Sequence, residues 1–243
     1  MLALFYPWGL ILQALAIVHF IRRRPDGYWL WIILMGGGIG AFAYMVAEVL
    51  PDAALLRGTF NAFPRRKRIR QLEAEVLENP SVGNFEELGD LLLEDKRYAR
   101  ARECFDRAIT PRTATLDPFY RRALAAIGLN DWPAAVADLE RVAAIDPKYD
   151  YHRAAGLLAH TLAQTGREEE ALARFAEATA VSTLSETQYN YASLLAASGQ
   201  RAEAREWLQR ILSKRLTLPG FARRRERPWF RKAAALSLRL QKG

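Results

Sequence analysis

The sequence predicts an all-α protein in which two apolar helices precede a solenoid of about four helix pairs. Two observations predict this fold class. The stretches from Leu2 to Ile21 and from Trp29 to Leu50 are almost free of charge, and at about 1.5 Å per residue each would reach the roughly 30 Å hydrocarbon thickness of a bilayer. Helical motifs then recur over residues 81–213, with key alanines at positions 101, 135, 171 and 204.

These patterns divide the chain into four parts. Residues 1–50 are expected to form a membrane-anchoring transmembrane hairpin, and residues 51–80 a basic juxtamembrane linker and a capping helix. Residues 81–213 hold the repeats, and residues 214–243 are expected to form a basic loop followed by a C-terminal capping helix.

The positive charge of the chain is concentrated in short flanks. The formal net charge is +8, yet residues 71–213 hold 16 Lys and Arg against 23 Asp and Glu. Residues 214–243 hold ten Lys and Arg against one acidic residue, Glu226. The overall basicity is therefore weak support for nucleic-acid binding, and the single cysteine, Cys104, excludes an intramolecular disulfide.

Neither apolar stretch has a polar face, so hydropathy favours membrane insertion of both. In the second stretch Gly36 and Gly40 form a small-residue face that is expected to pack against the first stretch or a partner helix. The basic run over residues 65–70 outweighs Arg22 to Arg24 of the intervening loop, which favours a cytoplasmic C-terminal domain. The first stretch either spans fully or is re-entrant.

The stretches Phe20 to Pro25, Tyr28 to Leu34 and Gly40 to Tyr44 resemble the two-helix leader of cardiolipin synthases and related phospholipase-D-type proteins. The resemblance implies a link to membrane lipids. The catalytic H-x-K motif of that family is missing, since neither His152 nor His160 nor the earlier His19 is followed two residues later by Lys. The resemblance therefore implies the membrane leader of that family but not its catalytic activity.

Each repeat combines a helix carrying a large apolar and a small residue with a second helix of the form Ala-x3-Phe or Ala-x3-Leu. The copies are Leu88-Gly89 with Ala101-x3-Phe105, Phe119-x3-Ala123 with Ala135-x3-Leu139, Leu158-Ala159 with Ala171-x3-Phe175, and Tyr191-Ala192 with Ala204-x3-Leu208. This pattern resembles the tetratricopeptide repeat (TPR) family. The resemblance implies antiparallel helix pairs stacked into an α-solenoid, with capping helices expected at residues 66–78 and 229–240.

The resemblance also implies a groove lined by the first helix of each pair. The family's carboxylate clamp for C-terminal peptides needs Lys and Asn where this chain has Glu86 and Asp90, so a peptide or helix with some positive charge is the expected ligand. An ordinary solvated face is the alternative. The groove candidates are Glu86, Glu87, Asp90, Tyr120, Arg121, Arg153, His160, Tyr189 and Asn190.

A basic segment near the C-terminus is a second candidate surface, formed by Arg223, Arg224, Arg225, Arg227, Arg231 and Lys232. Clustered cations favour an anionic membrane surface, at about 1 kcal/mol for each residue near the lipid. A solvated basic loop and nucleic-acid binding are the alternatives, and nucleic acid is the least favoured.

The sequence thus favours a membrane-anchored TPR adaptor that docks a protein partner at the bacterial inner membrane, with its repeats in the cytoplasm. We expect no enzymatic activity, cofactor, metal site or small-molecule substrate, because no acid–base pair, nucleophile set or metal-ligand cluster is evident. The alternatives are a regulatory role in membrane-lipid metabolism and nucleic-acid binding through the basic segment.

Overall fold

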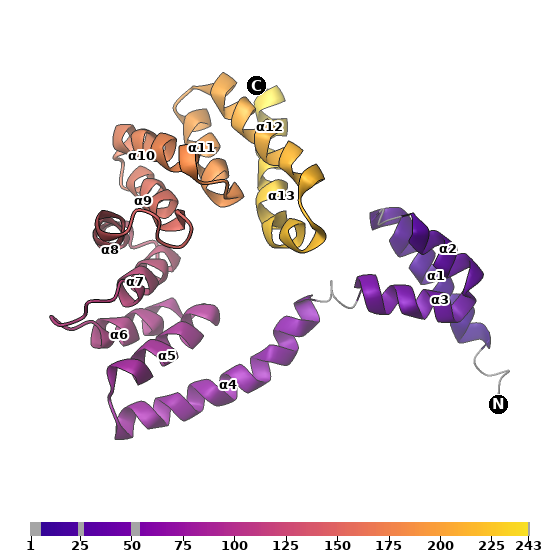
Figure 1. Cartoon of the computed structure of the whole chain (residues 1–243), viewed down its shortest axis with the longest axis horizontal. Coiled ribbons are helices and arrows are strands. Elements are labelled where there is room, and N and C mark those ends of the chain that lie inside the picture. Colours follow the sequence, from indigo (N-terminus) through magenta and orange to yellow (C-terminus); the bar gives the residue numbers. More distant parts are fainter. Residues whose placement is uncertain (1–5, 24–26, 50–53, 243) are drawn as a thin grey trace. The chain divides into compact units, whose positions relative to one another are not determined.

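The computed structural model describes residues 6–23, 27–49 and 54–242. The chain forms two compact units, an N-terminal unit of residues 1–68 and a solenoid unit of residues 69–243 (Figure 1). The helix α4 (Ala54–Glu78) begins in the first unit and ends in the second. Residues 1–5, 24–26 and 50 of the predicted hairpin and residues 51–53 of the predicted linker lie outside the described residues.

The N-terminal unit contains α1 (Tyr6–Arg23), α2 (Tyr28–Met35), α3 (Gly37–Tyr44) and the π-helix η2 (Met45–Val49). Its small core consists of Ala16, Ile33, Ala41 and Tyr44, which are fully buried. Two polar side chains of α1 turn into this core. The Gln13 side chain donates to the Ile33 carbonyl oxygen at 2.9 Å, and His19 Nδ1 lies 2.8 Å from the Tyr44 hydroxyl.

The second apolar stretch is not one helix, contrary to the prediction. It breaks between α2 and α3, where Gly37 has a φ of +54°, a conformation that favours glycine. Gly36 and Gly40 lie against the chain at this break, and a Cβ on Gly40 would approach the Ile32 carbonyl oxygen to 2.0 Å. The close approach to α1 is made by Gly38 instead, whose Cβ would lie 3.1 Å from the Cα of Gly9.

The two predicted membrane-spanning helices are not found. Among the residues that the structure describes, no helix is both long enough and apolar enough to cross a bilayer. The reason is visible in each stretch. The 18-residue α1 contains Gln13 and His19 and ends in Arg22 and Arg23, and the second stretch is divided into two helices of eight residues and the short η2.

The solenoid unit confirms the predicted repeats. Four antiparallel helix pairs follow α4, and the long α13 closes the array (Figure 1). The pairs are α5 (Val82–Glu94) with α6 (Tyr98–Ala108), α7 (Asp117–Gly128) with α8 (Trp132–Ile145), α9 (Arg153–Gln164) with α10 (Glu168–Val181), and α11 (Ser185–Ala197) with α12 (Arg201–Thr217), before α13 (Gly220–Lys242).

Small residues set the spacing of the helices, as the motifs predict. Gly89 faces the ring of Phe105, and a Cβ there would lie only 2.8 Å from the ring atom Cζ. Fully buried alanines occupy the equivalent crossings, and large apolar side chains fill the space beside them. The fully buried alanines are Ala101, Ala123, Ala135, Ala159, Ala171, Ala192 and Ala204, and the large side chains are Phe105, Leu139, Phe175 and Leu208.

The turn between the two helices of each pair places one residue in the left-handed region. These residues are Lys96, Asn130, Gly166 and Gly199, with φ between 59° and 81°. In each turn the next backbone N–H donates to a carbonyl of the preceding helix, as Arg97 does to Leu92 at 2.8 Å. The first two turns adopt this left-handed conformation with Lys96 and Asn130, whereas the last two adopt it with glycine.

Both ends of the array are capped. Ile69 and Leu72 of α4 pack on α5, and Phe230, Ala233 and Leu240 of α13 pack on α11 and α12. The predicted basic loop at the start of residues 214–243 is wrong, because α12 continues to Thr217 and α13 already begins at Gly220 with Pro228 inside it. The basic segment therefore projects from a helix, and the helix fixes which direction each cation faces.

Candidate binding groove

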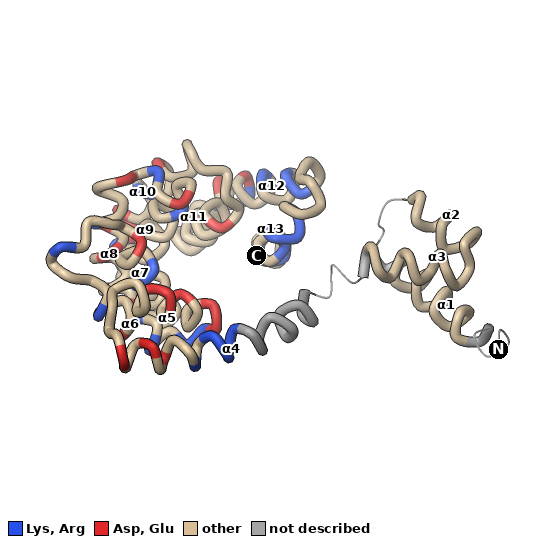
Figure 2. The backbone as a smooth tube through the Cα atoms, turned by 60° about the horizontal axis from the view of Figure 1, so that its bottom comes forward, with Lys and Arg blue, Asp and Glu red and all other residues tan. Residues whose placement is uncertain are grey.

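The first helices of the pairs, together with α13, line the inner curve of the solenoid unit (Figures 1 and 2). Side-chain contacts join each of these helices to the next. Arg121 of α7 pairs with Asp90 of α5 at 3.5 Å, and Arg153 of α9 pairs with Glu186 of α11 at 2.7 Å. Tyr189 of α11 then packs against Trp229 of α13, with ring centroids 5.8 Å apart. These contacts place four of the predicted groove residues along one face: Asp90, Arg121, Arg153 and Tyr189.

The end of the groove formed by α5 and α7 is acidic. Burial raises the pKa of Glu86, and the negative charges of Asp117 and Asp90 raise it further. Burial likewise raises the pKa of Asp90, although Arg121 acts in the opposite direction. The ion pair between Asp90 and Arg121 is more than two fifths exposed on both sides, so it holds the two side chains only weakly. The predicted residue Glu87 is exposed on the same helix.

The middle of the groove is a fixed polar network. The Tyr120 hydroxyl donates to Asp150 at 2.6 Å, and Arg153 donates to the Tyr120 hydroxyl at 3.4 Å and to Glu186 at 2.7 Å. Tyr120 itself is only 4% exposed and belongs to the core between α7, α8 and α9. The expectation that Tyr120 is a free contact residue is therefore wrong, because its ring packs and only its hydroxyl serves the network.

The loop before α9 has an unusual backbone. Asp150, Tyr151 and His152 all have positive φ, between 49° and 65°, and none of them is glycine. Each such residue costs on the order of 1–2 kcal/mol, and this conformation points Tyr151 outward, where it is 86% exposed. The loop also brings the Asp150 carboxylate to the network. Sequence reasoning missed this loop, since no glycine marks it.

The end of the groove formed by α11 and α13 is aromatic and basic. Lys232 lies over the rings of Trp229 and Tyr189, at 4.2 Å and 5.7 Å from their centroids. His160 packs edge-on against Trp132, and burial lowers the pKa of its imidazole. The last predicted groove residue, Asn190, is half-buried on α11 beside Tyr189.

The structure separates the six predicted basic residues. Lys232 faces the groove and Arg225 lines a pocket beside it, whereas Arg227 and Arg231 are exposed elsewhere on α13. Arg223 and Arg224 are also exposed, and Arg223 donates to the Leu218 carbonyl oxygen at 3.4 Å. The helix thus gives the groove two cations that the sequence reading assigned to a membrane surface.

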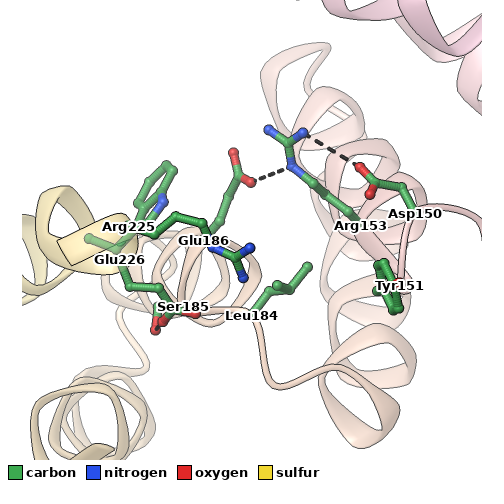
Figure 3. A pocket seen from close by; sticks show the side chains of 9 residues that line it. Asp150, Tyr151, Arg153, Leu184, Ser185, Glu186, Arg225 and Glu226 are labelled. Carbon is green, nitrogen blue, oxygen red and sulfur yellow. Dashed lines mark hydrogen bonds and ion pairs between the residues drawn. The ribbon is translucent and has the colours of Figure 1, made fainter. Parts of the chain in front are cut away.

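A pocket of about 570 Å³ opens where the loops before α9 and α11 meet the first turns of α13. Figure 3 shows Arg153 between Asp150 and Glu186 on one side and Arg225 reaching in from α13 on the other. The lining residues are Asp150, Tyr151, Arg153, Leu184, Ser185, Glu186, Arg225, Glu226 and Trp229. Of this set, the sequence proposed only Arg153 and Arg225 as site residues, because the packing of α13 against α11 joins distant parts of the chain.

No family model and no curated protein matches the chain, so the resemblance of the N-terminal stretches to the cardiolipin synthase leader is unsupported. Solved structures do match. MamA residues 41-end from Desulfovibrio magneticus RS-1 match at 18% identity and a TM-score of 0.57, over 68% of this chain and 90% of that one.

Two further structures have a TM-score of 0.54 and 20% identity. YrrB, described as a TPR protein with an unusual peptide-binding site, matches over 66% of this chain and 81% of its own. The nearly identical TPR-like repeats of a kinesin light chain from Podosopora anserina match over 65% and 90%. At such identities the likeness shows the fold alone: an all-α solenoid of the TPR type.

Proposed function

We propose that the solenoid unit is a scaffold that docks a segment of a partner protein in its groove, without chemistry of its own. The observation that carries the proposal is the continuous row of polar and aromatic side chains along α5, α7, α9, α11 and α13. Arg121, His160 and Tyr189 on this face are partly exposed and are not core residues. The peptide-binding site named for YrrB, which has the same fold, supports the proposal.

Site-specific photo-crosslinking tests the docking function. A photoreactive amino acid placed at Arg121 or at Tyr189 should crosslink the same partner in cells, because both positions line one groove. The control position is Arg174 on α10, a second helix of its pair, where the side chain is 51% exposed. A partner that crosslinks from Arg174 and from neither groove position would contradict the proposal.

We also propose that the N-terminal unit attaches the chain to a membrane, by placing exposed apolar side chains in lipid. Met35 and Ile39 are 84% exposed, Trp31 is 68% exposed, and α1 exposes Leu15 and Ile21 by more than half. An apolar surface of this kind is unusual on a protein surrounded by water. The exposed arginines of α13 would add attraction to anionic lipid.

The proposed location is the inner membrane of a bacterium, with the solenoid unit in the cytoplasm. The chain should stay with membranes after carbonate extraction, and loss into the soluble fraction would refute the attachment. For sidedness, Gln200→Cys should resist a membrane-impermeant thiol reagent in intact spheroplasts and react after lysis. Cys104 is buried, and burial raises the pKa of its thiol, so the native cysteine reacts slowly in either case.

A further inference from the structure

The carboxylates of the pocket beside α13 already have partners within the chain. Asp150 accepts from Tyr120 and lies 3.6 Å from Arg153, which also pairs with Glu186. Glu226 is 3.2 Å from Lys214 and accepts a hydrogen bond from Ser185. Each of these carboxylates is therefore already paired within the chain, and together they form part of the pocket wall.

Arg225 is different, since it makes no ion pair or hydrogen bond with any residue that the structure describes. Its guanidinium extends into the pocket toward Leu184 in Figure 3, and the exposed ring of Tyr151 lines the opposite side of the pocket. Trp229 contributes a further apolar surface, and Lys232 above it adds a second positive charge. An available arginine in a pocket that also offers apolar and aromatic surface suits a carboxylate next to an aromatic or aliphatic side chain.

The opposite end of the groove has the reverse character. Glu86, Asp90 and Asp117 lie close enough to repel one another, and Arg121 is the cation that opposes them. Oδ1 of Asp90 is buried and lies 3.5 Å from Nε of Arg121, but it accepts no hydrogen bond from a described residue. Figure 2 shows the contrast between acidic residues on α5 and basic residues on α13. A cationic side chain of a ligand would relieve the repulsion at the α5 end.

We propose that the groove selects a bipolar peptide, with Lys or Arg side chains over α5 and α7 and a carboxylate beside an aromatic or aliphatic residue in the pocket of α9, α11 and α13. This inference rests on the proposed docking function and adds the chemistry and the orientation of the docked segment. The fixed network of Tyr120, Asp150 and Arg153 forms one wall of the pocket and connects it to α7, so the distance from the pocket to the acidic end is fixed and the spacing of the two charged groups on the ligand is also selected.

Synthetic peptides of equal length test the proposal on the full chain in mild detergent, by fluorescence anisotropy. The bipolar peptide has a lysine cluster, a Gly-Ser spacer and a Trp-Glu-Glu end, and two control peptides replace one charged end or the other with Gly-Ser. The bipolar peptide should bind at least about tenfold more tightly than either control. Amidating its C-terminus, or replacing its glutamates with glutamine, shows whether the terminal or a side-chain carboxylate enters the pocket.

Two pairs of variants locate the ends of the peptide. Arg225→Glu should reduce binding of the bipolar peptide to that of the lysine-only peptide, and the matched control Arg227→Glu, two residues along α13, should leave it unchanged. Combined Glu86→Gln and Asp90→Asn should reduce binding to that of the acidic-only peptide. The control for this second pair is Glu103→Gln on α6, which is exposed outside the groove.

Three results would overturn the inference: equal binding of the bipolar and lysine-only peptides, equal effects of Arg225→Glu and Arg227→Glu, or no binding of any peptide. None of them decides the docking proposal, because that proposal is tested with the natural partner by crosslinking at Arg121 and Tyr189. A groove that crosslinks its partner and ignores peptide polarity would keep the scaffold function and remove the bipolar selection.

Discussion

Replacing Gly89 with alanine tests the packing that defines the first helix pair. The new Cβ would lie 2.8 Å from Cζ and 2.9 Å from Cε1 of Phe105, whereas ordinary contact begins at 3.4 Å. The ring must therefore retreat by roughly 0.6 Å, but Phe105 is only 1% exposed and is enclosed by Leu88, Leu92 and Ala101. Overpacking of this kind typically costs about 1–3 kcal/mol.

A matched control separates this strain from the helix propensity of alanine. Gly83 lies on the same helix α5, and a Cβ there would meet nothing within 4 Å. Gly83→Ala should stabilise the solenoid by up to about 1 kcal/mol, because glycine loses more backbone freedom on folding. Gly89→Ala receives the same gain and also the strain, so the two variants should differ by about 1–3 kcal/mol with Gly89→Ala the less stable.

The assay is urea denaturation followed by far-UV circular dichroism, with the chain in mild detergent. Phe105→Leu supplies the decisive comparison, since a smaller side chain leaves room for the methyl group of alanine. The double variant should then be more stable than the two single effects predict, with a coupling of about 0.5–3 kcal/mol. If Gly89→Ala stabilises the chain as much as Gly83→Ala does, the Phe105 ring does not occupy the space over Gly89 and the packing argument fails.

Three further outcomes are expected in the same assay. Arg122→Ala should lower the free energy of unfolding by about 3 kcal/mol. The Arg122 guanidinium makes two hydrogen bonds to Asp138, which is 6% exposed and would be left buried without its partner. An unchanged urea midpoint would contradict this. The pKa of Glu86 is raised above its ordinary value of 4.5, so the folded state favours the protonated carboxyl group. The stability that this group contributes is therefore present below pH 4.5 and is lost as the pH rises through the raised pKa. Glu86→Gln should accordingly raise the urea midpoint at neutral pH and leave it unchanged in acid. Gly199→Ala should destabilise by about 1–2 kcal/mol because its φ is +81°, and a neutral result would show that the turn can adopt another conformation.

The repeats were predictable because their packing is local. An alanine such as Ala135 and the leucine four residues later lie on one face of α8 and are both fully buried, so spacing alone indicates the pair. The left-handed turns at Lys96 and Asn130 were not predictable in the same way, because a backbone conformation that glycine usually supplies is reached there by other residues.

The N-terminal unit shows the limit of hydropathy. Mean apolar character measures the cost of exposure to water and says nothing about the continuity of a helix, so the stretch from Trp29 to Leu50 was predicted as one helix. The glycines at 36 to 38 carried the information that was needed, since three successive glycines both lower helix propensity and permit the positive φ found at Gly37.

The groove was predictable at the level of helices and less so at the level of side chains. Tyr120 follows the aromatic position of its repeat by one residue, which suggests exposure, but the loop at Tyr149 and Asp150 covers its ring. The pocket residue Arg225 was assigned to a basic loop, because its environment depends on α13 packing back against helices that lie more than 30 residues earlier.

The proposed selection of a bipolar peptide rests on how paired and available charges are distributed along the groove. In the middle, Arg153 connects Tyr120 of α7 with Glu186 of α11, so three successive first helices are tied by one side chain and their spacing is fixed. The ends are not tied in this way: Asp90 has a weak exposed pair, and Arg225 has no partner among the described residues. On the proposed docking function, a rigid centre with available charges at its ends would discriminate by the distance between opposite charges on the ligand, because only a segment of matching length reaches both ends at once.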